Sequence, residues 1–533
     1  MKRRILFAGI AGLPVGFCYV AGAALETDKT IDLLQKSFYG KWFAGSLLAA
    51  CLIGVLFWGI EHFKWDRKEC GKELPVFRTH VFSVLILMAC WLPALLSIFP
   101  GAFSYDALDE LTQVQTGMLT AHHPVLHVLF LGGIVEGLHS ITGSYNIGIA
   151  VYSILQMLIV ANVLAATLDF MREFAVPKWF RWMTLLFYGL SPVMQLFAIC
   201  ATKDVLFTAA QTMLLLYTLR MVCKRDEFFQ KKSWKIGFCV SAFFAMTLRN
   251  NGLYVVLLLL LILFCYCKKE RKPFGILAAG ILLPYLLYAY PFQAVMHVAP
   301  GGVEEKLSVP IQQMARVYRF HCEELDPADL ELLYEVLPEE YLVQYRPGIS
   351  DFVKKGFRKE AYDAHKKEYF DLWLKWGKEY PLAYVNSFLL NTVDFWYPHA
   401  VVDGYEFDDG RTSYFDYMVD EPGNEVVLLP GLHAYYEKIS YTVNGQKHPL
   451  AFLYLSPGWY FVVTWIVFMW LWYSKRYGMM IPMSILGFTF MTVLLGPIAL
   501  VRYVLIFYYA FPIVCSLLVF TNRYEAKTKM QSI

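Results

Sequence analysis

Apolar segments about as long as a lipid bilayer is thick recur along most of the chain. A helix needs about 20 apolar residues to cross the hydrocarbon core of a membrane. Twelve stretches come near this length: 5–24, 40–60, 80–99, 145–169, 179–200, 203–222, 235–249, 252–267, 273–291, 452–473, 479–498 and 501–521. The two stretches between 235 and 267 are short and are separated only by Asn250-Asn251. The pattern predicts an all-α, polytopic membrane protein with about twelve transmembrane helices.

Basic residues mark one side of these predicted helices. Short cytoplasmic connections are enriched in Lys and Arg. Such residues occur in Lys2-Arg3-Arg4, in the segments 61–80, 170–181, 223–235 and 268–272, in Lys475-Arg476 and in the tail. If twelve helices alternate, all of these segments lie on one side, so we expect a multi-pass protein of the cell membrane with both termini in the cytoplasm. Residues 1–24 also resemble a signal peptide, whose cleavage would leave every later segment oriented as before.

This topology divides the chain into five parts. They are three N-terminal transmembrane helices in 1–99, a first outer loop with an interfacial helix in 100–144, a helix bundle in 145–291, an extracytoplasmic domain in 292–450, and three C-terminal transmembrane helices with a cytoplasmic tail in 451–533. The outer domain contains 26 acidic and 15 basic residues, a net charge of −11 in a chain of net charge +3. Within this domain, Asp326 before Pro327 predicts the N-terminus of a helix.

The composition narrows the class of protein further. Hydrophobic residues make up 57% and charged residues 17% of the chain, whereas a soluble protein has about a quarter charged residues. This excludes a disordered chain, a nucleic-acid-binding protein and a secreted disulfide scaffold. Most of the eleven cysteines lie in apolar segments, and the outer domain contains only Cys322. Cysteines in such positions favour packing over a metal site or a disulfide.

Ionisable residues gather at the predicted outer ends of the helices. An ionisable group at membrane depth costs several kcal/mol unless it is paired or hydrated. The residues concerned are Asp106, Asp109, Glu110, His122, His123, Lys203, Asp204, Arg249 and Arg502. They come from five separate places in the chain, yet the topology puts them at one membrane level. We expect them to form the rim of a single cavity.

Three carboxylates follow the helix stop at Pro100-Gly101. If a helix starts at Ser104, then Asp106, Asp109 and Glu110 lie on one face of it and need a cation, a basic partner or water. A carboxylate in this position can act as a general base toward a hydroxyl group. The alternative is that Ser104 caps the helix and Asp106 complements its dipole. The neighbouring polar residues favour the functional role for Asp106 more than for the other two.

The histidines of the first outer loop are the next candidates. His123 precedes Pro124 and has the position to orient a substrate hydroxyl or to bind a metal. His127 lies four residues further on, but no third ligand is evident, so the zinc signal is weak. We expect a capping or interface role for His127 and His139, and an interfacial helix after Pro124.

Cations from three distant segments complete the polar level. Lys203, Arg249 and Arg502 together have the charge to hold a phosphate group, for which arginine offers a bidentate fork. Two alternatives remain open. Lys203 and Asp204 neutralise each other as an isolated pair, or Lys203 and Arg502 extend toward lipid headgroup phosphates.

These motifs together resemble the GT-C superfamily of polytopic glycosyltransferases, which includes protein O-mannosyltransferases and the bacterial aminoarabinose transferases of lipid A. Ser104-Tyr105-Asp106 and then His123-Pro124-Val125-Leu126 match an acidic residue in the first outer loop and a His-Pro-Pro-Leu-like interfacial helix. Thr202-Lys203-Asp204, and Arg502-Tyr503 followed by Phe511-Pro512, also resemble that group. Val125 replaces the second proline, and the outer domain matches none in that group. Leu307–Gln313 and Asp394–Pro398 resemble an uncharacterised bacterial membrane family related to it.

The resemblance implies a GT-C-like fold and an inverting sugar transfer. The donor would be a polyprenyl-phosphate sugar in the membrane, and the acceptor an extracytoplasmic glycan, lipid or protein of a bacterial cell envelope. Asp106 would remove the proton from the acceptor hydroxyl. Asp109, Glu110, His123, Lys203, Asp204, Arg249 and Arg502 would bind the substrates, and the cations would stabilise the leaving phosphate. Whether a divalent cation shares that task stays open.

Two other classes of protein fit part of the pattern. A carrier or flippase for a lipid-linked saccharide would need the cations but not the outer carboxylate. Such transporters often contain internal repeats with broken helices in both halves, and the sequence contains no such pairing. A polysaccharide polymerase or ligase would use the same class of donor with a different loop chemistry.

Overall fold

The computed structural model describes residues 2–62, 75–400, 415–520 and 524 of the chain, and in these residues it contains helices and isolated bridges but no strand. Each of the twelve apolar stretches coincides with a helix or a pair of helices. These are α1 (Lys2–Asp28), α2 (Lys36–His62), α3 (Val76–Ser97), α6 (Tyr145–Glu173), the pair α7 (Lys178–Leu190) and α8 (Pro192–Ile199), α9 (Lys203–Cys223), α11 (Lys232–Thr247), α12 (Asn250–Tyr266), α13 (Arg271–Leu287), α25 (Pro457–Tyr473), α26 (Tyr477–Val493) and α27 (Leu505–Val519). The all-α fold class is confirmed.

The number of membrane-crossing helices differs from the predicted twelve. By length and composition, eight helices of the described residues are long and apolar enough to cross a membrane, or nine if the pair α7 and α8, bent by 55°, is one span. The helices α11, α12, α25 and α26 have only 16 or 17 residues, because polar, Gly or Pro residues interrupt their apolar stretches. Together these helices indicate a multi-pass membrane protein.

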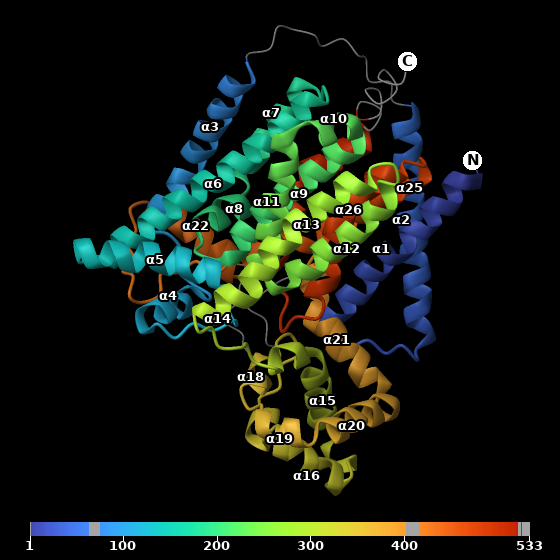
Figure 1. Ribbon diagram of the computed structural model, residues 1–533. Helices are drawn as coiled ribbons and strands as arrows, with labels where there is room; N and C mark the ends of the chain where they lie inside the picture. Colours follow the sequence, from blue (N-terminus) through green and yellow to red (C-terminus); the bar gives the residue numbers. More distant parts are fainter. Residues whose placement is uncertain (1, 63–74, 401–414, 521–523, 525–533) are drawn as a thin grey trace.

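The predicted interfacial helix is α5 (Val125–Thr142), which at 18 residues is itself one of the eight candidate spans. Figure 1 shows α5 running across the direction of α3 and α7. It packs against α4 (Ala107–Thr116) and α6. The segment that carries Asp106 therefore lies beside α5, at one end of the bundle.

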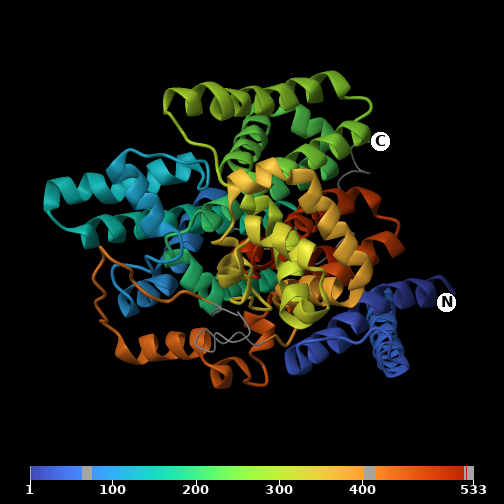
Figure 2. The same cartoon turned by 90° about the horizontal axis from the view of Figure 1, so that it is seen from below.

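Small residues allow the two N-terminal helices, α1 and α2, to pack closely. A Cβ at Gly16 of α1 would lie 2.5 Å from the backbone nitrogen of Ser46 on α2, and one at Gly12 would lie 2.7 Å from the Ser46 oxygen. Contacts of this kind bring helix backbones together in membranes, where apolar burial alone gives no preference for protein over lipid. Figure 2 shows this pair at the edge of the molecule.

A small helical domain projects from one end of the bundle (Figure 1). Its helices are α15 (Ser308–His321), α16 (Pro327–Val336), α17 (Glu339–Leu342), α18 (Asp351–Lys354), α19 (Lys359–Ala364), α20 (Lys366–Glu379) and α21 (Pro381–Trp396). They enclose a separate apolar core that includes Ile311, Leu333 and Trp376. Asp326 caps α16 as predicted, because its Oδ1 accepts a hydrogen bond of 2.9 Å from the Ala328 N–H.

Residues 415–441 of the predicted outer domain pack against α3 and the segment that follows it, and not against the small helical domain. The backbones of Phe99 and Val426 exchange two hydrogen bonds, and the Asp420 N–H donates to the Phe103 carbonyl. Further along, α22 (Pro430–Tyr441) contacts α3. Residues 415–441 therefore lie against the segment that leads from α3 to Asp106. The predicted 401–414 portion of this domain lies outside the described residues.

The remaining short elements connect the larger helices. They are α10 (Arg225–Gln230), η1 (Tyr288–Phe292), α14 (Gln293–Val295), η2 (Glu304–Leu307), η3 (Cys322–Glu324), α23 (Val443–Gln446), α24 (Phe452–Leu455) and η5 (Val501–Val504). Of these, η5 matters most for the site, because it places Arg502 just before α27.

Candidate functional site

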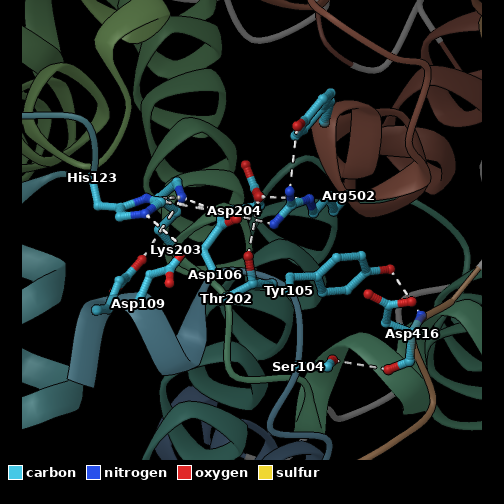
Figure 3. A network of polar contacts seen from close by, with 12 residues as sticks. Ser104, Tyr105, Asp106, Asp109, His123, Thr202, Lys203, Asp204, Asp416 and Arg502 are labelled. Carbon is cyan, nitrogen blue, oxygen red and sulfur yellow. Dashed lines mark hydrogen bonds and ion pairs between the residues drawn. The ribbon is translucent and has the colours of Figure 1, made fainter. Parts of the chain in front are cut away.

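Five charged side chains from four places in the chain meet at one point of the fold, and Figure 3 labels all of them except Arg249. We call them the ionic cluster: Asp106, Lys203, Asp204, Arg249 and Arg502. Asp106 immediately precedes α4, Lys203 and Asp204 begin α9, Arg249 immediately precedes α12, and Arg502 lies in η5. Each is therefore at a helix terminus or beside one, as the sequence predicted.

Backbone pairing fixes the approach of Asp106 to Lys203. The Ala201 N–H donates a hydrogen bond of 2.8 Å to the Ala102 carbonyl, which ties the segment after α3 to the segment before α9. Gly101 makes this close approach possible. Its φ is 124°, and a Cβ there would lie 2.2 Å from the Ser153 hydroxyl oxygen, so a larger residue would disrupt the pairing.

Asp106 accepts hydrogen bonds from two cations. The Lys203 ammonium donates to its Oδ2, and Nη1 of Arg502 donates to the same oxygen at 3.0 Å. Lys203 also donates to Nδ1 of His123 at 3.0 Å. The carboxylate therefore links α9 with η5, two elements about three hundred residues apart in the chain.

Asp204 pairs with both arginines rather than with its neighbour Lys203. Arg249 donates to its Oδ1, and Nε of Arg502 lies 3.6 Å from its Oδ2, which also accepts from the Thr202 hydroxyl at 3.1 Å. The prediction of a self-neutralising Lys203–Asp204 pair is wrong, because successive residues of a helix point in different directions. Arg502 is only 7% exposed, so its extension toward lipid headgroups is also wrong.

Aromatic rings cover the two arginines. The Arg502 guanidinium carbon lies 4.3 Å from the centroid of the Tyr105 ring, and that of Arg249 lies 4.3 Å from the Tyr503 ring. Such contacts stabilise a buried guanidinium and fix its plane. Tyr105 has a φ of 58°, an uncommon conformation for a bulky residue that turns its ring under Arg502.

The three carboxylates of the first outer loop separate in the structure. The helix α4 begins at Ala107, not at Ser104, and the Ser104 hydroxyl donates to the Asp416 carbonyl instead of capping it. Asp109 is 76% exposed, with its Oδ2 4.0 Å from Nε2 of His123, whereas Glu110 is 1% exposed. The helix start predicted at Ser104 is wrong, and Asp109 lies at the rim of the site.

His127 continues the site into the protein, a role that the predicted capping or interface position missed. It is completely buried, with Nδ1 hydrogen-bonded to Glu110 and Nε2 lying 2.8 Å from the Tyr152 hydroxyl oxygen. Tyr152 donates to Gln156 at 3.0 Å. The four-residue spacing of His123 and His127 was visible in the sequence, but nothing there indicated Tyr152 and Gln156 as partners.

The neighbouring charges change the acidity of two side chains. Burial alone would raise the pKa of the Asp106 carboxyl, but Arg502 and then Lys203 outweigh burial and hold this pKa well below its usual range. Burial and then the charge of Lys203 lower the pKa of His123 to about 4, against the opposing effect of Asp106 and Glu110. At neutral pH, Asp106 is therefore ionised and His123 is neutral.

The protonation state of His123 leaves one donor without a hydrogen bond. An ammonium group only donates hydrogen bonds, so Nδ1 of His123 accepts from Lys203 and the ring hydrogen lies on Nε2. This nitrogen is buried and has no hydrogen-bond partner among the described residues. A buried N–H without an acceptor costs about 1–3 kcal/mol, which a substrate oxygen at this point would recover.

An apolar cleft opens beside the ionic cluster, between α5, α6, α9 and α11. Its volume is about 440 Å³, and its lining is apolar apart from His127 and Ser241. Leu206 is three residues beyond Lys203, and Leu248 immediately precedes Arg249. The cleft therefore runs along α9 and α11, the helices that carry Lys203 and adjoin Arg249, and none of the three cations is among its lining residues.

The residues present do not fit a resident divalent cation. No group of three His, Cys, Asp or Glu side chains within the described ranges is placed to hold a metal ion. Asp106 and Asp204 are paired with Lys203, Arg249 and Arg502, and these positive charges repel a cation.

Comparison with protein families gives a match over most of the chain. Residues 113–531 match the family of unknown function DUF6020. The matched region contains His123, Lys203, Asp204, Arg249 and Arg502 and begins shortly after Asp106, Asp109 and Glu110. No curated protein and no solved structure matches the chain significantly.

Proposed function

The chain belongs to the DUF6020 family, and we propose that it transfers a sugar from a polyprenyl-phosphate donor to an acceptor on the outer side of the membrane. One observation carries the proposal: α9 begins with the buried Lys203, which meets the buried Arg502 and the partly buried Arg249 in the ionic cluster, and farther along the same helix lines an apolar cleft. A ligand that fits both has an anionic head and an apolar tail. A lipid phosphate is such a ligand, and its phosphate would contact Lys203 and Arg502.

Asp106 would be the general base of this reaction. In the resting site it is a weak base, because Lys203 and Arg502 hold its pKa well below the usual range. A donor phosphate competes for the same two cations, so donor binding raises this pKa and frees the carboxylate. Asp106 then accepts the proton of an acceptor hydroxyl.

The proposed transfer needs no reactant other than the donor and the acceptor. The acceptor oxygen forms a bond to the anomeric carbon, and the bond from that carbon to the phosphate oxygen breaks. The prenyl phosphate leaves as an anion, which Arg502 and Lys203 stabilise as its charge develops. The Nε2–H of His123 makes no hydrogen bond within the described residues, its nearest carboxylate oxygen being Oδ2 of Asp109 at 4.0 Å, and it would donate to a phosphate or sugar oxygen.

The resemblance to the GT-C superfamily supports the same reaction and the extracytoplasmic location of the site. Its acidic residue and its histidine correspond to Asp106 and His123, and the structure brings the two side chains to within 4.0 Å of each other.

A transfer assay separates this proposal from a carrier of lipid-linked saccharides. Purified protein is reconstituted in liposomes that contain a radiolabelled polyprenyl-phosphate sugar and envelope acceptors. We expect release of prenyl phosphate and transfer of label, both strongly reduced in Arg502→Ala. The matched control is Arg319→Ala, since Arg319 is exposed on α15. Movement of intact donor across the bilayer, with no bond broken, would contradict the proposal and favour the carrier.

A further inference from the structure

A chain of buried polar groups lies directly behind the ionic cluster. It runs from Glu110 through His127 and Tyr152 to Gln156, and all four side chains are 0 or 1% exposed. Glu110 also faces the cluster, because its Oε1 lies 3.7 Å from the Lys203 ammonium. The proton count of this chain determines whether Glu110 adds a negative charge to the site.

The inner end of the chain fixes the direction of its hydrogen bonds. The Gln156 side-chain nitrogen donates to the carbonyls of Phe197, Ala198 and Cys200 at 3.3, 3.1 and 2.7 Å. Carbonyl oxygens only accept, so the Gln156 amide oxygen points the other way and must accept from the Tyr152 hydroxyl. Tyr152 has then used its one hydrogen.

The same reasoning reaches Glu110. Because the hydrogen of Tyr152 is used, its oxygen accepts from Nε2–H of His127. The bond between Nδ1 of His127 and Glu110 needs one further proton, carried either by the imidazole or by the carboxyl group. In both cases the Glu110–His127 pair holds that proton and has no net charge.

Among the described residues, the cations of the ionic cluster outnumber its ionised carboxylates by one. Within the described residues, the ion pairs of Lys203, Arg249 and Arg502 involve only Asp106, Asp204 and Glu110. Glu110 is neutralised by His127, so three cations face two carboxylates. Asp109 is exposed to solvent, and Figure 3 shows Asp416 on the far side of the Tyr105 ring from Arg502.

We infer that the neutral Glu110–His127 pair sets the charge of the site so that it selects a singly charged phosphodiester over a diphosphate-linked donor. The inference rests on the proposed function, because it assumes that a lipid phosphate binds at the ionic cluster. A polyprenyl-phosphate sugar carries one negative charge, which one uncompensated cation matches. A diphosphate brings at least two, and the second has no cation left to meet it.

The test uses binding and does not require turnover. Isothermal titration calorimetry of the purified full-length protein measures farnesyl methyl phosphate, a singly charged diester, and farnesyl diphosphate. We expect the wild type to prefer the diester. His127→Asn keeps a donor toward Glu110 but cannot hold the extra proton, so Glu110 becomes a carboxylate that pairs with Lys203. We expect diester binding to weaken by about tenfold or more, as for the loss of one charge-assisted contact.

The decisive arm is a rescue. In Glu110→Gln the side chain is an uncharged amide, so it needs no shared proton to stay neutral. This variant should bind the diester like the wild type, and so should the double variant Glu110→Gln/His127→Asn. Ser153→Ala is the matched control, because it removes a buried hydroxyl of α6 that has no hydrogen-bond partner among the described residues and does not change the charge. Thermal melting verifies that each variant is folded.

The outcomes distinguish the two proposals. A double variant as weak as His127→Asn would show that the chain only supports the fold, and would overturn the inference, as would an altered affinity of Glu110→Gln. A wild type that prefers farnesyl diphosphate would also overturn it. A wild type that binds neither phosphate would instead refute the proposed function.

Discussion

Replacing Asp106 by Asn should weaken turnover and strengthen donor binding at once. The amide cannot accept the proton of the acceptor hydroxyl, and loss of a general base lowers kcat by about 10²–10⁴-fold. The same substitution releases Lys203 and Arg502, which Asp106 now holds. A hydrogen bond to a charged group contributes about 1.5–3 kcal/mol, so binding of a phosphodiester should tighten by at least about tenfold.

Two measurements follow these opposite effects. Transfer from a radiolabelled polyprenyl-phosphate sugar in membranes gives kcat, and calorimetry with farnesyl methyl phosphate gives the affinity of the anion site. The matched control is Asp363→Asn on α19, because that exposed carboxylate pairs only with Lys359 within the described residues. Melting curves verify that both variants are folded, and Asp106→Asn should melt at a lower temperature than Asp363→Asn because it loses the ion pairs of Asp106 with Lys203 and Arg502.

Each half of the expectation can fail separately. Retained turnover in Asp106→Asn would move the general base to another residue. Unchanged or weaker binding of the diester would show that Asp106 does not compete with phosphate for the two cations. In that case, the idea that donor binding frees the carboxylate would be wrong, even if turnover were lost.

Three further predictions follow from other parts of the structure. The pKa of His123 is about 4 in the folded chain and about 6.5 in an unfolded one, so the free energy of unfolding that it contributes is complete above about pH 6.5 and is lost as the pH falls toward 4. Melting curves of wild type and His123→Gln should therefore converge toward pH 4, and a difference that is constant with pH would contradict this. Ala210→Trp narrows the apolar cleft and should reduce the preference for a long polyprenyl donor over a farnesyl donor; an equal loss for both chain lengths would place the tail elsewhere. Asp326→Ala removes the cap of α16 and should cost about 1 kcal/mol of stability with unchanged transfer, measured by urea unfolding, whereas a loss of transfer would indicate that this domain takes part in the reaction.

Hydrophobic length was sufficient to predict where the helices lie. The apolar stretches correspond to helices because a segment with few polar side chains satisfies its backbone groups most simply by internal hydrogen bonds. The number of crossings did not follow from length. Residue 125 begins a helix that is apolar enough to span, and the two stretches around Arg249 form two short helices.

The members of the site were predictable, but their partners were not. Ionisable residues at helix ends were sufficient to select Asp106, Lys203 and Arg502, because such groups are costly at membrane depth. Which carboxylate Lys203 meets depends on side-chain direction at the first turn of α9. The position of His127 depends on how α5 packs on α6, and no sequence pattern gave that contact.

Breaks between the helices explain why the site lies where it does. Arg249 lies in an extended conformation between α11 and α12, Thr202 is extended before α9, and Leu500 is extended before η5. Each break leaves backbone groups that lipid cannot satisfy, so the breaks must face protein or water. A side chain meets this need in the segment before η5, where the Asn391 side-chain nitrogen donates to the Gly496 carbonyl at 2.9 Å. Three helix breaks thus form a polar region inside an apolar bundle. The ionic cluster occupies this region because charged side chains need polar partners there, which the rest of the bundle does not offer.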